Sequence, residues 1–201
     1  MMPDESSGIY SEPFVYTADW YERVYSGGKI DMDACFGCFG EHEERDMACL
    51  ASVSPSQLDR VLVCGCGGGD NAGMLAWRWG IHNMTLVDWS RLSVALCRRR
   101  FPNAKVLQAD VSCLPFEDHS FDLITALDLT EHLSEEVYWK FLGEVKRLLM
   151  PTFGRAIFLP GMTRRPEHIN ARTVHQLALD LQSLGFGGLR GNQVWVSARD
   201  R

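Results

Sequence analysis

The sequence contains no run of apolar residues long enough to cross a membrane, and no short apolar core of the kind that marks a secretory signal. It also has no excess of basic residues, since 20 Lys and Arg stand against 26 Asp and Glu, for a net charge of −6. A nucleic-acid-binding surface needs concentrated positive charge, so this balance argues against such a partner. We therefore expect a cytoplasmic protein that binds neither nucleic acid nor a membrane.

A recognisable disulfide or zinc framework is also missing, although seven cysteines are present. An odd number of cysteines in a chain without an export signal predicts reduced thiols. Cys35 and Cys38 have the spacing of zinc ligands, but no second Cys-x-x-Cys completes a site. We expect no bound metal.

What the chain does have is a glycine-rich turn directly after an apolar run, in VLVCGCGGGDN at Val61–Asn71. Gly65, Gly67 and Gly69 permit a sharp reversal and let a ligand approach the backbone closely. Asp88 closes the next apolar run, MTLVD, where a carboxylate can accept hydrogen bonds from ribose hydroxyls. Asp110 closes a third run, AKVLQAD. These features predict a site for a nucleoside-containing ligand.

From Arg60 onward, short apolar runs alternate with amphipathic segments, which predicts a mostly parallel sheet covered by helices on both faces. The last two strands are separated by too few residues for a crossover helix, so the last strand is expected to be antiparallel. Strands are expected near residues 60–64, 83–87, 104–109, 121–127, 154–160, 185–190 and 193–198. Helices are expected near residues 71–79, 90–100, 134–149 and 170–184.

A dinucleotide-binding turn is the first alternative for the glycine segment. Its GxGxxG pattern needs a third glycine at position 70, where this chain has Asp70. A carboxylate there would repel a pyrophosphate held at the helix N-terminus. The local chemistry therefore disfavours NAD as the ligand.

Five segments in order, VLVCGCGGG, LVDWS, QADVSCLPFEDHSFDLI, EHL and RLLMPTFGRAIF, resemble the class I S-adenosylmethionine (SAM) dependent methyltransferases. The likeness runs from about Val61 to Phe158 and is strongest to the branch that methylates small molecules. It implies an α/β, Rossmann-like three-layer sandwich with a seven-stranded, mostly parallel sheet whose last strand is antiparallel. It also implies SAM as cofactor and a small organic molecule as methyl acceptor.

The resemblance assigns the cofactor-binding residues. Backbone groups of Gly65, Cys66 and Gly67 are expected to hold the methionine end of SAM, and Asp88 the ribose hydroxyls. The adenine is assigned to three further residues: Trp89 against one face, the Asp110 carboxylate at the amino group, and the Val111 N–H at a ring nitrogen.

On the acceptor side, the segment ALDLTEHL after the fourth strand makes Asp128 and His132 candidates for a general base or for positioning the acceptor. Residues 1–55 are predicted to form an aromatic, partly helical flap region in front of a SAM-binding domain at 56–201. Within it, Tyr16, Trp20 and Tyr21 are the candidate substrate-side residues. A dimer is compatible with this organisation.

Two other functions stay open at this stage. One is a protein (lysine) methyltransferase, because the loop after the fifth strand has no room for a substrate lid. The other is a methyltransferase-like module that binds SAM without transferring its methyl group. It stays open because Val63 replaces an acidic residue usual in the family, and MPTFG replaces the usual K-P-G-G turn.

Overall fold

The computed structural model describes residues 60–80, 83–161, 168–187 and 194–197. The predicted flap region, with Tyr16, Trp20 and Tyr21, and the Cys35–Cys38 pair lie outside these residues. The division at residue 55 therefore stays a prediction.

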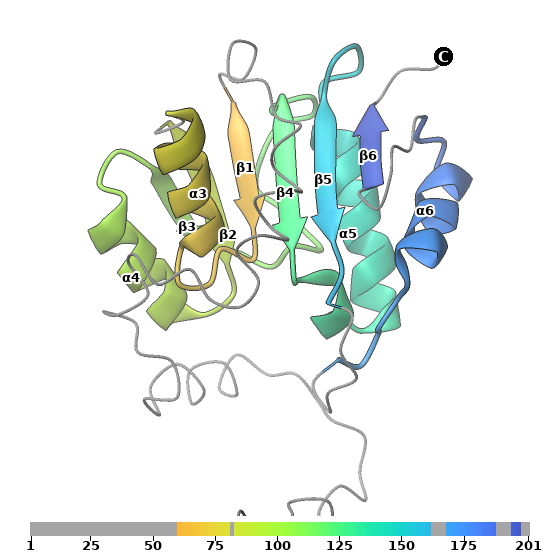
Figure 1. Ribbon diagram of the computed structural model, residues 1–201, viewed down its shortest axis with the longest axis horizontal. Helices are drawn as coiled ribbons and strands as arrows, with labels where there is room; N and C mark the ends of the chain where they lie inside the picture. The colour runs from red at the N-terminus through yellow and green to blue at the C-terminus, as the bar shows by residue number, and fades with distance from the viewer. Residues whose placement is uncertain (1–59, 81–82, 162–167, 188–193, 198–201) are drawn as a thin grey trace, which may run out of the picture.

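The described strands form one six-stranded sheet in the order β3-β2-β1-β4-β5-β6 (Figure 1). β1 through β5 run parallel, and β6 pairs with β5 in antiparallel register. Successive strands are added on one side of β1 up to β3 and on its other side from β4 onward. Open α/β sheets bind their ligands at such a switch point in the strand order. The strands are β1 (Val61–Cys64), β2 (Met84–Asp88), β3 (Lys105–Gln108), β4 (Leu123–Leu127), β5 (Arg155–Leu159) and β6 (Val194–Ser197).

Helices cover both faces of this sheet (Figure 1). Successive strand residues point to opposite faces. Leu62 therefore packs with the residues of α5 and α6, whereas Val61 and Val63 pack with those of α3 and α4. The predicted α/β, Rossmann-like architecture is confirmed. The helices are α3 (Asp70–Trp79), α4 (Arg91–Arg100), α5 (Glu135–Leu148) and α6 (Val174–Ser183), with a 3-10 turn, η2 (Thr130–His132).

Half of the predicted strand near residues 185–190 lies within the described residues, and residues 185–187 belong to none of the strands of the sheet. Six strands are therefore what the described part of the chain contains. None of its helices combines the length and apolarity needed to span a bilayer.

The last helix begins later than the sequence predicts, at Val174 instead of residue 170. Thr173 and Gln176 form a reciprocal capping box that starts the helix at this point. The preceding residues make other contacts, because the Asn170 N–H donates to the Glu131 carbonyl at 3.0 Å. The sequence also gave no sign of η2, which turns the chain directly after β4.

Candidate functional site

The glycine turn after β1 has the backbone that its sequence predicts. Gly65, Gly67 and Gly69 have φ values of +65°, +51° and +94°, all in the left-handed region. A Cβ on Gly69 would lie 2.6 Å from the ring of Phe101. The turn therefore needs glycine at this position for conformation and for space.

Asp88, the last residue of β2, ties the turn to the neighbouring strand. Its Oδ2 accepts from the Gly67 N–H at 2.8 Å, and its Oδ1 accepts from the Ser90 N–H at 2.8 Å. The Cys66 N–H also donates to the Val87 carbonyl at 3.0 Å. A carboxylate has about four acceptor positions. The Gly67 and Ser90 N–H groups use one position on each oxygen, so Asp88 orders the turn.

The adenine-side residues also lie at the carboxyl ends of the strands. Trp89 is 45% exposed, and its carbonyl accepts from Gln108 Nε2 at 3.0 Å. Asp110 is exposed and holds its loop through Oδ1, which accepts from the Ser112 N–H at 2.8 Å. Val111 is buried, and its N–H donates to no group among the described residues. This donor and the Asp110 carboxylate have the complementary polarity that an adenine edge needs.

Cys66 lies within the turn, and its thiol faces Cys97 of α4 with an Sγ–Sγ distance of 3.6 Å. The hydrogen bond to Cys97 and burial raise the pKa of Cys66 well above its usual value. The thiol therefore stays protonated at neutral pH. This agrees with a role for Cys66 through its backbone.

Asp128, the first residue after β4, has φ +49°, which non-glycine residues rarely adopt. Its N–H donates to the Leu159 carbonyl at the end of β5, at 2.8 Å. This hydrogen bond fixes the point at which the chain leaves the sheet. Strained backbone of this kind concentrates at ligand sites.

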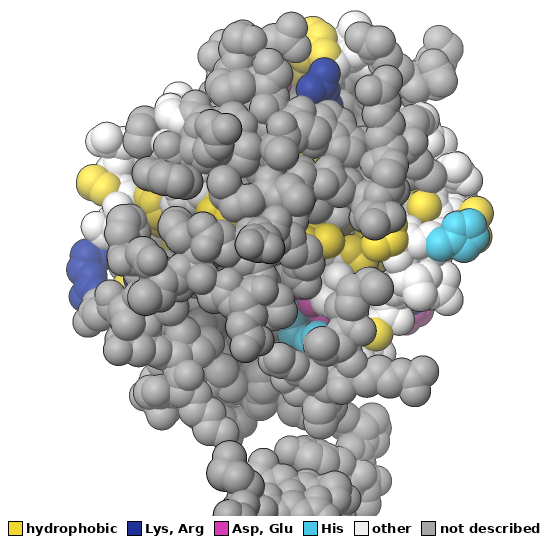
Figure 2. Space-filling model, in the orientation of Figure 1, with side chains coloured by type: hydrophobic (Ala, Val, Ile, Leu, Met, Phe, Trp, Pro, Cys, Tyr) yellow, Lys and Arg dark blue, Asp and Glu magenta, His cyan; other side chains and the backbone are white. Residues whose placement is uncertain are grey.

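A cluster of three side chains lies just beyond Asp128. Glu131 is 1% exposed, and its Oε1 is 3.9 Å from His132 Nε2. The ring of His168 meets that of His132 edge-to-face, with centroids 4.9 Å apart. A Cβ on Gly161, after β5, would collide with Glu131 Oε1. We call Glu131, His132 and His168 the Glu–His–His cluster. Figure 2 shows histidine and acidic side chains together toward the lower end of the molecule, where β1, β4 and β5 end in Figure 1.

The sequence identified His132 but missed Glu131 and His168. Glu131 adjoins His132 in the EHL segment, which was a usable signal. His168 had no such signal, because it follows β5 in the chain. It meets the other two because β4 and β5 are neighbours in the sheet.

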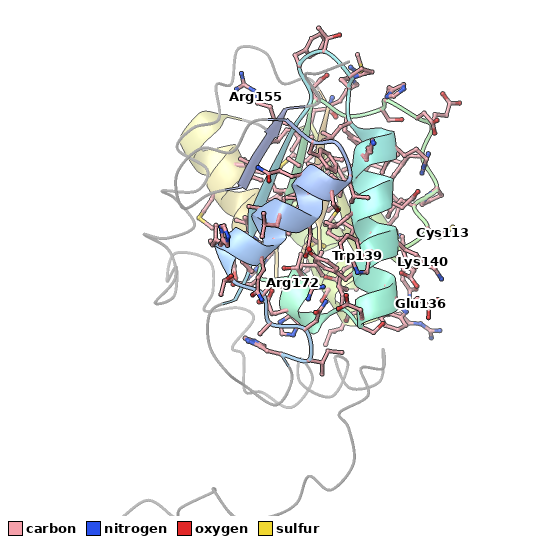
Figure 3. All side chains as sticks on the ribbon, turned by 90° about the vertical axis from the view of Figure 1, so that its right-hand side faces the viewer. Cys113, Glu136, Trp139, Lys140, Arg155 and Arg172 are labelled. Carbon is pink, nitrogen blue, oxygen red and sulfur yellow. The ribbon has the colours of Figure 1, made fainter. Side chains whose placement is uncertain are left out.

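Arg172 anchors the segment that follows His168 (Figure 3). Its guanidinium donates to Asp180 of α6 at 2.8 Å, to Glu135 of α5 at 2.8 Å and to Asn170 at 2.5 Å. It also lies 4.2 Å from the ring centroid of Tyr138, whose hydroxyl donates to Asp180 at 2.8 Å. Burial raises the pKa of Tyr138, so this hydroxyl remains a donor. The network holds residues 170–173 against both helices.

A family model described as a methyltransferase domain matches residues 61–152. A probable S-adenosylmethionine-dependent methyltransferase of Mycobacterium tuberculosis is 30% identical over 135 residues, which are 63% of this chain and 48% of that protein. The phthiotriol/phenolphthiotriol dimycocerosates methyltransferase of Mycobacterium tuberculosis is 31% identical over 165 residues, 73% of this chain and 59% of that protein. The chain thus spans about half the length of these curated relatives.

Among solved structures, phosphoethanolamine N-methyltransferase 2 of Haemonchus contortus, in complex with S-adenosyl-L-methionine, has a TM-score of 0.64. The match covers 86% of this chain and 45% of that one, at 21% identity. At this identity the likeness concerns the fold, which the two chains share.

Proposed function

We propose that this chain is a class I SAM-dependent methyltransferase that transfers a methyl group from SAM to a small organic acceptor. The observation that carries the proposal is the meeting of three groups at one edge of the sheet. They are the left-handed glycine turn, the Asp88 carboxylate hydrogen-bonded to Gly67, and the Asp110–Val111 pair.

SAM is the cofactor of this family and, when bound, would supply an activated methyl group carried on a sulfonium sulfur. The residues present fit this molecule. The turn at Gly65–Gly67 offers backbone groups, and two of its three residues carry no side chain of their own. The Asp88 carboxylate would accept hydrogen bonds from the ribose. The Val111 N–H and the Asp110 carboxylate are available to the adenine edge, and exposed Trp89 to its face.

On the acceptor side, we place Asp128 and His132, which follow β4 at the same edge of the sheet. Their proposed role is to orient the acceptor and, where methyl transfer requires deprotonation of the acceptor, to accept its proton. A small acceptor is supported by the name of the mycobacterial relative, which refers to phthiotriol and phenolphthiotriol dimycocerosates. The alternative of a protein acceptor rests on the short connection between β5, which ends at Leu159, and α6, which begins at Val174, since it leaves no room for a substrate lid.

Several parts of the proposal stay predictions. The flap at residues 1–55 would close the site, and the complete sheet would contain seven strands with the last one antiparallel. A cytoplasmic location is supported by the four described cysteines, all of which are free thiols.

The test is direct binding followed by product analysis. Calorimetry should show that SAM and S-adenosylhomocysteine bind the purified chain, and both should raise its melting temperature by mass action. Incubation with SAM and fractionated small-molecule extracts should release S-adenosylhomocysteine. It should also give a product that is heavier than its acceptor by one methylene group, about 14 Da. Binding of NAD with no binding of SAM or S-adenosylhomocysteine would overturn the proposal. SAM binding with no methylated product in any extract would favour the module without transferase activity.

A further inference from the structure

The Glu–His–His cluster offers two imidazoles and a carboxylate at the carboxyl edge of the sheet. We propose that Glu131, His132 and His168 bind a divalent transition-metal ion, with zinc as the reference ion, beside the methyl-acceptor position. The sequence predicts no metal, because no second Cys-x-x-Cys completes a site with Cys35 and Cys38.

The ligand atoms of the three side chains already lie close enough together to approach a single metal ion. One ligand atom from each residue lies within 4.8 Å of the other two, and His132 Nε2 is 3.9 Å from Glu131 Oε1. Ligands about 2.0–2.1 Å from a tetrahedral cation are about 3.3–3.5 Å from one another. Side-chain movements on the order of 1 Å would therefore bring the three ligands into place.

The contact between His132 and Glu131 differs from that of an ordinary hydrogen-bonded ion pair. The 3.9 Å between His132 Nε2 and Glu131 Oε1 exceeds the usual hydrogen-bond range of about 2.7–3.2 Å. The rings of His132 and His168 meet at 84°, with ring centroids 4.9 Å apart. The distance between the His132 and Glu131 ligand atoms is thus too long for a shared proton but close to the separation that a bridging cation requires.

Burial adds an electrostatic reason. The Glu131 side chain is 1% exposed. Burying a carboxylate is costly unless a cation or hydrogen-bond donors compensate its charge. A dication held by Glu131 and the two imidazoles would add to the compensation that the other neighbours of Glu131 provide.

The backbone holds these ligands in place. Glu131 and His132 are consecutive in η2, and the Asn170 N–H donates to the Glu131 carbonyl at 3.0 Å. Arg172 in turn fixes Asn170 to α5 and α6 through the contacts described above. Residues 168–173, the described segment that carries His168, are therefore anchored to the turn that carries the other two ligands. Such preorganisation is what a metal site requires of its supporting residues.

The donor set indicates the class of ion and the class of ligand. Two imidazoles and one carboxylate suit zinc, cobalt(II) and iron(II), whereas Mg²⁺ and Ca²⁺ prefer oxygen ligands alone. Three protein ligands leave at least one coordination position open. An acceptor with a hydroxyl or carboxylate oxygen would bind there; this part rests on the proposed function. With the ion bound, His132 serves as a ligand and not as a base.

The test uses the full chain without an affinity tag, treated with chelator and loaded with Zn²⁺ or Co²⁺. Equilibrium dialysis with elemental analysis should find one equivalent bound. Co²⁺ should give visible d–d bands without the near-ultraviolet charge-transfer band that thiolate ligands produce. Acetohydroxamate, a small oxygen chelator, should shift these bands if coordination positions are open.

Three variants make the outcome specific to the cluster. Glu131→Gln and His168→Ala should each weaken metal binding at least about tenfold, because loss of supporting groups alone costs about 10–100-fold. His175→Ala is the matched control, since His175 is an exposed histidine of α6 outside the cluster. It should bind the ion as wild type does. Because His168 is partly exposed and lies outside helices and strands, its variant provides the test if Glu131→Gln does not fold.

Two results would overturn the site. One is no binding of either ion by folded wild-type protein. The other is binding that survives His168→Ala and carries the thiolate band, which would assign the metal to cysteines. An unchanged cobalt spectrum with acetohydroxamate would overturn the open position. SAM affinity is measured on the same samples to distinguish the two proposals. SAM binding without metal binding would refute only the metal site. Absence of SAM binding would refute the proposed function.

Discussion

Asp88→Asn tests whether this carboxylate binds the cofactor or only supports the glycine turn. In the structure, Oδ2 accepts from the Gly67 N–H and Oδ1 from the Ser90 N–H, each at 2.8 Å. The asparagine side chain keeps the shape but replaces one oxygen with an NH2 group. Because the NH2 group is itself a donor and would face the N–H of Gly67 or of Ser90, one of the two hydrogen bonds must be lost.

The expected loss of stability follows from the contribution of a hydrogen bond to a charged group, which is about 1.5–3 kcal/mol. The free energy of unfolding should therefore fall by about 2 kcal/mol. If Asp88 also binds the ribose diol, SAM affinity should fall by a similar free energy. Since about 1.4 kcal/mol corresponds to a factor of ten, the dissociation constant should rise about 10- to 100-fold.

Asp122→Asn is the matched control. Asp122 is 4% exposed and accepts hydrogen bonds from the Arg60 backbone N–H at 3.1 Å, from Nε at 3.2 Å and from Nη2 at 2.7 Å. It precedes β4, whereas the site lies after β4, at the opposite edge of the sheet. Asp122→Asn should destabilise the fold by an amount comparable to Asp88→Asn, about 1–3 kcal/mol, and leave SAM affinity unchanged.

Urea unfolding and calorimetry with SAM, on both variants and at a temperature where both are folded, provide the assay. A selective loss of SAM affinity in Asp88→Asn supports the ribose role. Equal SAM affinity in wild type and Asp88→Asn would refute it. Equal losses in the two variants would attribute the effect to stability, and the reasoning from the Asp88 contacts would be wrong.

Two further predictions concern stability. Gly69→Ala should lower the free energy of unfolding by about 1–3 kcal/mol, because φ is +94° and the new Cβ would lie 2.6 Å from the ring of Phe101. Gly143→Ala should instead raise it by about 0.5–1 kcal/mol, because Gly143 lies inside α5 and a Cβ there would meet nothing within 4 Å. Urea unfolding that changed the stability of both variants in the same direction would contradict this. The hydrogen bond from Arg147 lowers the pKa of Glu144 from 4.5, so the stability that ionised Glu144 contributes is present above pH 4.5 and is lost as pH falls through the lowered folded-state pKa. The stability difference between wild type and Glu144→Gln should therefore shrink below pH 4.5, and a difference independent of pH would contradict the assignment.

Local pattern was enough to predict much of the fold. The apolar runs that became β1, β2 and β3 end at or next to Cys64, Asp88 and Gln108, close to where the sequence placed their ends. The glycine turn was also predictable, because its three positive φ values depend on residues within the turn. Asp88 was identifiable because it closes the strand that follows the turn, and consecutive parallel strands commonly lie side by side.

Element boundaries that depend on contacts with distant residues were less predictable. Residues 170–173 have a composition compatible with a helix, yet they remain outside α6. Asn170 instead contacts Glu131, and Arg172 pairs with Glu135 and Asp180. The competing partners are remote in sequence, so helix periodicity alone could not reveal them.

The sequence by itself determined the alternation of strands and helices, the glycine turn and the acidic residue at the end of β2, because each depends on neighbours within a few positions. Only the tertiary structure decided that His168 meets Glu131 and His132. That meeting requires β4 and β5 to be adjacent and their following loops to turn toward each other. Adjacency of strands is set by how the whole set of apolar faces packs, and no local pattern around His168 carries that information.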